Sequence, residues 1–234
     1  MASRRAAFFD IDRTLVGANT GNLYMRWRFR NGQATVYEVF RVMKWMAQYT
    51  LGVNDTSSVT AKALTLVEGM EERLFVDECR TFFSADVAPR ISAAAREEVI
   101  ACRDAGFECV ILSAATPYVA QAVASEFAIP SYLCSSLEVV DGRFTGQLSK
   151  PLCYGSRKVE VAEDWAAEHD VDLTESAFYS DSYSDLPMLK RVGIPVVVNP
   201  DPRLRWYAKR EGWPIREWRP RRLPRSLEAV AATR

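Results

Sequence analysis

The segment FFDIDRTLV, residues 8–16, contains an apolar run that is followed at once by two aspartates, Asp10 and Asp12. A short apolar run of this kind is typical of a strand that is buried on both faces of a parallel sheet. Two carboxylates placed so close repel each other, and a purely structural strand end gains little from them. Alternate residues of a strand point to opposite faces, so the chain must bend after Asp10 if Asp12 is to lie beside it. The segment therefore predicts a first strand that ends in a functional site.

Further apolar runs, with helical patterns between them, predict an α/β fold. The apolar runs suggest strands at residues 6–11, 108–114, 177–180 and 195–198. Helix-start signals stand at Ser92, at Thr116-Pro117 and at Ser156, and each is followed by apolar residues at helical spacing. Strands that alternate with helices indicate a parallel sheet covered by helices on both faces. Residues 139–144 also predict a hairpin, because Asp141-Gly142 is a typical two-residue turn.

Residues 17–89 lack strand-like runs, and their patterns are helical. They contain an apolar face that is made of Val36, Val39, Phe40 and Met43 and widened by Trp45 and Tyr49. We expect an all-helical cap, inserted after the first strand into a core that consists of residues 1–16 and 90–212. In open parallel sheets ligands bind at the carboxyl ends of the strands, so an insert that leaves from this edge is positioned to cover a site.

The chain ends in a Pro- and Arg-rich tail, residues 213–234. We expect a solvated, partly disordered end that packs Trp213 or Trp218 on the surface. A weak contact with an anionic surface is the alternative.

Composition excludes several classes of protein. Thirty basic residues balance thirty acidic ones, so no overall charge attracts the chain to nucleic acid. No apolar run reaches the roughly 18 residues of a transmembrane helix, although a peripheral contact with lipid stays open. The five cysteines are scattered, odd in number and without a CxxC motif, which favours a reduced, cytoplasmic protein. The sequence gives no indication of the oligomeric state.

Polar side chains stand at or just beyond the predicted strand ends. They are Asp10 and Asp12, Ser113, Lys158, and Asp181 with Asp185. In a parallel sheet these ends converge on one rim, where carboxylates, a hydroxyl and an ammonium together indicate a divalent cation and a phosphate. Oxygen ligands suit Mg²⁺, which also offsets the repulsion between the carboxylates. Asp10 is then placed to attack phosphorus, and Asp12 to act as a general acid.

These residues resemble the motifs of one enzyme family. Residues 10–14 resemble the DxDxT motif of the haloacid dehalogenase-like phosphatases, and Ser113, Lys158 and the acidic segment 180–185 resemble the other three motifs, in the expected order. The helical insert stands where the phosphoserine-phosphatase-like subfamily carries its cap. The resemblance implies a Rossmann-like core and a phosphatase that hydrolyses a small phosphomonoester through an aspartyl-phosphate.

The resemblance also implies a role for each residue. Asp10 is the nucleophile and a Mg²⁺ ligand, Asp12 is the general acid and base and binds the metal through its carbonyl, and Asp181 is the other metal ligand. Ser113, Ala114 and Lys158 hold the phosphoryl group, with Thr14 and Asp185 in support. Asp185 either supports the metal shell or orients Lys158.

Some positions depart from the family pattern. Arg13 and Ser182 replace residues that are commonly small in relatives, and neither change removes a reacting group. Phosphoserine phosphatases place a glutamate nine residues after the nucleophile, where it meets the substrate amine, but this chain has Asn19 there. Phosphoserine is therefore disfavoured as the substrate.

Alternatives remain for the function and for single residues. Basic and aromatic residues in the insert (Tyr24, Arg26, Trp27, Arg28, Phe29, Arg30) leave a lipid phosphate, of the phosphatidylglycerophosphate kind, as an alternative substrate. A non-catalytic phospho-acceptor or binding protein is an alternative of a different class, but it would not need Asp12. Lys158 could instead be a solvated lysine, Asp185 a helix cap, and His169 is expected to be a surface residue.

Overall fold

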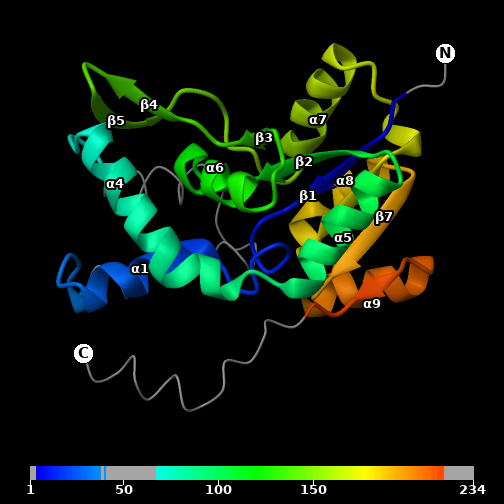
Figure 1. Cartoon of the computed structure of the whole chain (residues 1–234), viewed down its shortest axis with the longest axis horizontal. Helices are drawn as coiled ribbons and strands as arrows, with labels where there is room; N and C mark the ends of the chain where they lie inside the picture. The colour runs from blue at the N-terminus through cyan, green and yellow to red at the C-terminus, as the bar shows by residue number, and fades with distance from the viewer. Residues whose placement is uncertain (1–3, 38–39, 41–66, 219–234) are drawn as a thin grey trace.

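A computed structural model describes residues 4–37, 40 and 67–218 of the chain. Its core is a six-stranded, fully parallel sheet with the strand order β3-β2-β1-β6-β7-β8 (Figure 1). The strands are β1 (Ala6–Phe9), β2 (Glu108–Ser113), β3 (Ser131–Cys134), β6 (Ala177–Ser180), β7 (Ile194–Val198) and β8 (Ile215–Arg216). The predicted α/β fold is confirmed.

The first strand lies in the middle of the sheet. It pairs with β2 on one side and with β6 on the other, so that Phe9 lies opposite both Ile111 and Tyr179. All four residues of β1 are fully buried, which explains why the sequence here is a continuous apolar run. The segment beyond Phe9 therefore emerges between the carboxyl ends of β2 and β6.

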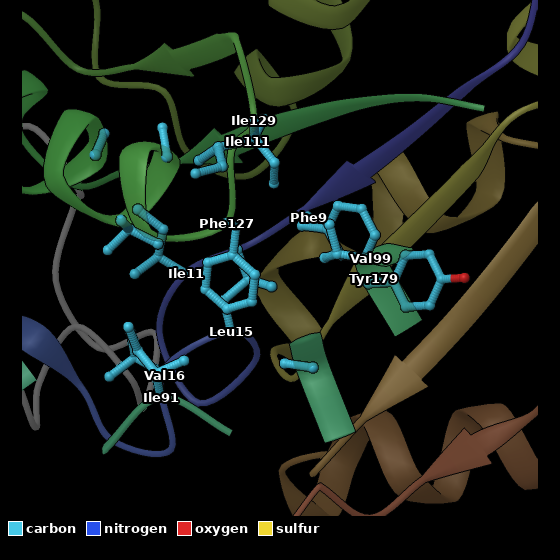
Figure 2. Close-up of a cluster of buried hydrophobic side chains, with 14 of the residues drawn as sticks. Phe9, Ile11, Leu15, Val16, Ile91, Val99, Ile111, Phe127, Ile129 and Tyr179 are labelled. Carbon is cyan, nitrogen blue, oxygen red and sulfur yellow. The ribbon is translucent and has the colours of Figure 1, made fainter. Parts of the chain in front are cut away.

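Helices cover both faces of the sheet, as predicted. One face packs against α5 (Ala93–Asp104) and α6 (Pro117–Glu126), and Figure 2 shows part of this core around Phe9, Ile111 and Tyr179. The other face packs against α7 (Arg157–Glu168), α8 (Leu186–Arg191) and α9 (Pro202–Glu211). Successive residues of β1 alternate between these two layers, since Phe9 belongs to the first and Phe8 to the second.

The sheet has two edge strands that the sequence did not suggest. Strand β3 joins β2, and β8 joins β7. The latter lies in the segment expected to be a solvated tail, and Trp218 just after it is buried at 5% exposure rather than packed on the surface. Residues 219–234 lie outside the described residues.

Two of the three helix starts have the expected local structure. Ser92 caps α5 by accepting a hydrogen bond from the Ala95 backbone N–H, and Pro117 is the first residue of α6. Ser156 also precedes α7, but its side chain makes no capping hydrogen bond and its backbone is already helical. Short helical turns, η3 (Leu173–Glu175) and η4 (Tyr183–Asp185), flank β6.

The predicted hairpin is confirmed and forms a second, two-stranded sheet of β4 (Leu137–Val140) and β5 (Arg143–Leu148). Asp141 and Gly142 both have positive φ, 50° and 73°, as a type I′ turn requires.

The described parts of the insert are helical. They are α1 (Thr20–Arg30), α4 (Glu72–Phe82), and the turns η1 (Phe83–Val87) and η2 (Ala88–Arg90), which lead back to α5. Trp27 of α1 is buried, whereas Phe29 of the same helix is exposed, and so are Val36 and Phe40, which we expected on the apolar face of the insert. Phe29 is two residues from Trp27 and so faces away from the side that Leu23 and Trp27 share. Val39, Met43, Trp45 and Tyr49 lie outside the described residues, and the domain boundaries stay a prediction.

Two expectations from composition can be compared with the structure. All five cysteines are free. Among the residues that the structure describes, none of the helices has both the length and the apolar character needed to cross a bilayer.

Candidate active site

Asp10 lies directly beyond β1, and the chain bends there as predicted. Its backbone N–H still donates to the Tyr179 carbonyl at 3.0 Å, which continues the pairing with β6 by one residue. The next residues form a tight turn, in which the Val16 N–H donates to the Ile11 carbonyl at 2.9 Å and Arg13 has φ 53°. We call residues 10–16 the nucleophile loop.

Lys158 joins two aspartates at the centre of the site. Its ammonium lies 2.9 Å from Asp10 Oδ1 and 2.7 Å from Asp185 Oδ2, and all three side chains are buried. Lys158 is therefore not a solvated lysine. Asp185 makes no capping hydrogen bond to α8 but accepts from Lys158 and from the Ser180 hydroxyl, so it orients Lys158.

The pKa shifts of these groups reflect both their burial and the charges beside them. Burial raises the pKa of Asp10 to about 6, although the Lys158 ammonium opposes the shift. Burial would lower the pKa of Lys158, but the Asp10 and Asp185 carboxylates outweigh it, and the pKa is raised. The ammonium is thus held in its charged form, in contact with the expected nucleophile.

The carboxylate of Asp12 turns toward the start of α1. Its Oδ1 accepts from the Thr20 backbone N–H at 2.9 Å and from the Thr20 hydroxyl at 2.7 Å, and its Oδ2 accepts from the Asn19 amide at 2.6 Å. Burial raises the pKa of Asp12, while the hydrogen bonds from Thr20 lower it. The sequence analysis did not predict these contacts with Asp12. The pattern that could have indicated them is Asn19-Thr20, because Asn and Thr are common at the start of a helix.

Asp181 follows β6 and is a third buried carboxylate on this rim, after Asp10 and Asp185. Burial, together with the charges of Asp10 and Asp185, raises its pKa well above the usual range. The guanidinium of Arg13, which is half exposed, lies 3.7 Å from the Asp181 carboxylate.

The remaining predicted residues lie at the same edge of the sheet. Ser113 is the last residue of β2, buried, two positions beyond the residue that pairs with Phe9. Ala114 follows it and is half-buried. Thr14 is fully buried, and its hydroxyl has no hydrogen-bond partner in the described part of the chain. His169, which was not expected to belong to the site, caps the far end of α7, is partly exposed and stacks on Trp165.

The chemistry of the donors on this rim, which are carboxylate and carbonyl oxygens, suits a divalent metal ion. The described residues contain no cluster of three His, Cys, Asp or Glu side chains arranged to hold a metal. The Asp12 carboxylate is engaged by α1, so a site here would use the Asp10 and Asp181 carboxylates with a backbone carbonyl. Three carboxylates on this rim are buried (Asp10, Asp181 and Asp185), but the buried Lys158 ammonium pairs only with Asp10 and Asp185, so a divalent cation would offset the excess negative charge.

A family model described as haloacid dehalogenase-like hydrolase matches residues 7–190, which include every residue of this site. The chain belongs to the haloacid dehalogenase-like hydrolases. Among similar proteins of this kind, the phosphoserine phosphatase SerB1 of Mycobacterium tuberculosis is 34% identical, over 92% of this chain and 71% of the relative. The histidinol-phosphatase of Neisseria meningitidis is 28% identical, over 91% of this chain and 98% of the relative.

Solved structures share the fold of this chain. A protein of unknown function from Bordetella pertussis has a TM-score of 0.84 and 27% identity, over 92% of this chain and 99% of the other. A substrate-bound phosphoserine phosphatase has a TM-score of 0.71 over 99% of both chains, but its identity of 16% makes this a likeness of fold alone. The family resemblance is confirmed, and the chain is an enzyme of the phosphoric monoester hydrolase class.

Proposed function

We propose that this chain is a Mg²⁺-dependent phosphatase that hydrolyses a small phosphomonoester through an aspartyl-phosphate on Asp10. The observation that carries the proposal is the buried Lys158 ammonium, 2.9 Å from Asp10 and 2.7 Å from Asp185, on a rim that also holds a third buried carboxylate, Asp181. Burying charged groups is costly unless they are paired or serve a function. Buried charges of this kind therefore indicate a functional site rather than a surface cluster.

In the first step an oxygen of the Asp10 carboxylate forms a bond to phosphorus as the bond from phosphorus to the ester oxygen breaks. Asp12 supplies the proton that the leaving oxygen takes up. In the second step a water molecule attacks phosphorus, Asp12 accepts its proton, and inorganic phosphate leaves as the Asp10 carboxylate is restored. The three hydrogen bonds from Asn19 and Thr20 favour the carboxylate form of Asp12, which this second step needs.

Charge around the phosphoryl group is shared between the protein and the metal. Lys158 presents a positive charge to the transferring group, and we propose that the Ser113 hydroxyl donates a hydrogen bond to it. When bound by Asp10, Asp181 and the Asp12 carbonyl, Mg²⁺ would polarise the phosphoryl oxygens.

Asn19 bears on the choice of substrate. Its amide nitrogen donates to Asp12 and its oxygen accepts from the Asn22 N–H, so both ends of the amide are engaged within the protein. A neutral, engaged amide does not provide the negative charge that a substrate amine needs at this position. We therefore propose a small phosphomonoester other than phosphoserine.

Phosphate release from a broad panel tests the proposal. The panel contains sugar, nucleoside and amino-alcohol phosphates, with phosphoserine, histidinol phosphate and a phosphatidylglycerophosphate. We expect turnover of a water-soluble ester that stops with EDTA, returns with Mg²⁺, and is lost in Asp10→Asn while the circular dichroism spectrum is kept. Substantial turnover by Asp10→Asn would refute the role of Asp10, and indifference to EDTA would remove the metal. Turnover of the lipid substrate alone would favour the lipid phosphatase instead.

A further inference from the structure

The loop between β7 and α9 contacts both of the loops that carry the catalytic aspartates. It contains Asn199, Pro200 and Asp201, of which Asn199 contacts the nucleophile loop and Asp201 contacts the segment 181–185, here called the acidic loop. We propose that Asn199 and Asp201 are positioning residues that fix these two loops relative to each other. The proposal rests on the proposed function, because the two loops must hold Asp10 and Asp181 close together.

Asn199 makes use of both ends of its side-chain amide. The nitrogen donates to the Arg13 carbonyl at 2.7 Å and to the Trp218 carbonyl at 3.1 Å, and the oxygen accepts from the Trp218 N–H at 2.8 Å. Its φ of 44° is a left-handed conformation that asparagine tolerates better than most residues. Because a carboxylate could not donate and an apolar residue could do neither, the bridge requires an amide at this position.

The bridge connects the nucleophile loop to a rigid part of the core. Trp218 is buried, and its ring stacks on Tyr179 with the ring centroids 5.9 Å apart. Tyr179 in turn stacks on Phe9 at 4.5 Å, and Figure 2 shows these two rings side by side. Phe9 directly precedes Asp10. The chain is thus held on both sides of Asp10, by ring stacking at Phe9 just before the nucleophile loop and by the Asn199 amide at Arg13 within it.

Asp201 makes the corresponding contacts with the acidic loop. Its backbone N–H donates to the Asp181 carbonyl at 2.9 Å, and its Oδ2 accepts from the Tyr183 N–H at 2.7 Å. Its Oδ1 accepts from the Arg203 and Leu204 N–H groups and so caps α9. The short β7–α9 loop therefore contacts two catalytic segments. The Asn199 side chain holds the nucleophile loop, and the Asp201 side chain holds the acidic loop.

Asn199→Gly is the sharpest test of the first contact. Glycine keeps the left-handed backbone while it removes the amide, so the variant loses the bridge without added strain. The matched control is Asp170→Gly, which also replaces a left-handed residue (φ 55°) with glycine, in an exposed turn just after α7 and outside the catalytic loops. Activity is measured as release of inorganic phosphate from the best substrate of the panel, well below the unfolding temperature.

We expect kcat of Asn199→Gly to fall about tenfold or more, because small displacements of reacting groups carry penalties of that order. KM changes little, and hydrogen exchange at residues 13–16 becomes faster. Asp170→Gly keeps the kcat of the wild type. A kcat of Asn199→Gly equal to that of the wild type, or an equal loss in both variants, would overturn the proposal. An inactive wild type with faster exchange at residues 13–16 in Asn199→Gly would instead refute the proposed function and leave the positioning contact standing.

Asp201→Ser keeps the proposal testable if Asn199→Gly does not fold. Serine is a good cap for α9 but is too short to reach Tyr183 as well, so helix stability is kept while the contact is lost. We expect a lower kcat with a nearly unchanged unfolding temperature, and faster exchange at residues 182–185. An unchanged kcat would show that the acidic loop does not depend on Asp201.

Discussion

At the scale of single residues, the site depends on buried charges that compensate each other. Lys158 pairs with two carboxylates, and its ammonium and both carboxylates are buried. Taking such groups out of water is costly, and the cost is tolerable only while the partners are present. Lys158 therefore combines two functions, since it supports the folded state and supplies charge to the proposed reaction.

Replacing Lys158 with alanine tests whether this lysine is a buried, paired residue or an ordinary surface lysine. The change leaves Asp10 and Asp185 as uncompensated buried carboxylates, so we expect a loss of about 3–5 kcal/mol in the free energy of unfolding. Urea unfolding measures it, and phosphate release measures the accompanying loss of activity. The control is Lys209→Ala on the exposed side of α9, for which we expect a change within about 0.5 kcal/mol. Equal stabilities of the two variants would contradict the assignment.

At the scale of elements, the β4–β5 hairpin joins the core to the inserted helices. The Gly69 N–H donates to the Phe144 carbonyl at 2.8 Å, the Phe144 N–H to the Met70 carbonyl at 3.1 Å, and the Glu72 N–H to the Gly142 carbonyl at 2.9 Å. Figure 1 shows α4 and the hairpin side by side. Phe144 is buried against Phe75 of α4, with ring centroids 5.2 Å apart. The hairpin therefore fixes the start of α4 relative to the core.

Truncating Phe144 tests this connection. Phe144→Ala removes a ring that packs on both Phe75 and Tyr118, and such changes cost about 3–5 kcal/mol. We expect faster hydrogen exchange in α4 than in the wild type, because the helix loses its contact with the hairpin. Val140→Ala, at an exposed position of the same hairpin, should leave exchange in α4 unchanged. Uniformly faster exchange over the whole sheet would instead indicate a general loss of stability.

The strands that could be predicted from the sequence are those that are buried over most of their length. Residues 6–9, 109–113 and 177–180 are all buried, so their apolar runs are visible without knowledge of the fold. Strand β3 is only partly buried and β8 has two residues, so both depend on pairing with β2 and β7. Likewise, the order of the motifs indicated Asp10, Lys158 and Asp181, but the contacts of Asn19 and Asn199 depend on how distant segments pack.

At the scale of the whole molecule, the excess negative charge at the rim would link folding to binding of the proposed metal ion. Asp10 and Asp181 are both buried, and the charge of Asp10 is one of the causes that raise the pKa of Asp181. This repulsion opposes folding when no cation is bound. A ligand that binds only the folded state stabilises it, by about 2.7 kcal/mol at a hundred times its dissociation constant.

Asp181→Asn should consequently change the unfolding temperature, relative to the wild type, in opposite directions with and without Mg²⁺. In EDTA the variant loses a repulsive buried charge while it keeps a side chain of similar size, so its unfolding temperature should equal or exceed that of the wild type. With Mg²⁺ the wild type should gain stability, and the variant, which lacks the proposed metal ligand, should gain little. Thermal unfolding followed by circular dichroism measures both and needs no substrate. Equal Mg²⁺-induced shifts in the two proteins would mean that Asp181 does not bind the metal, whatever the activity of either.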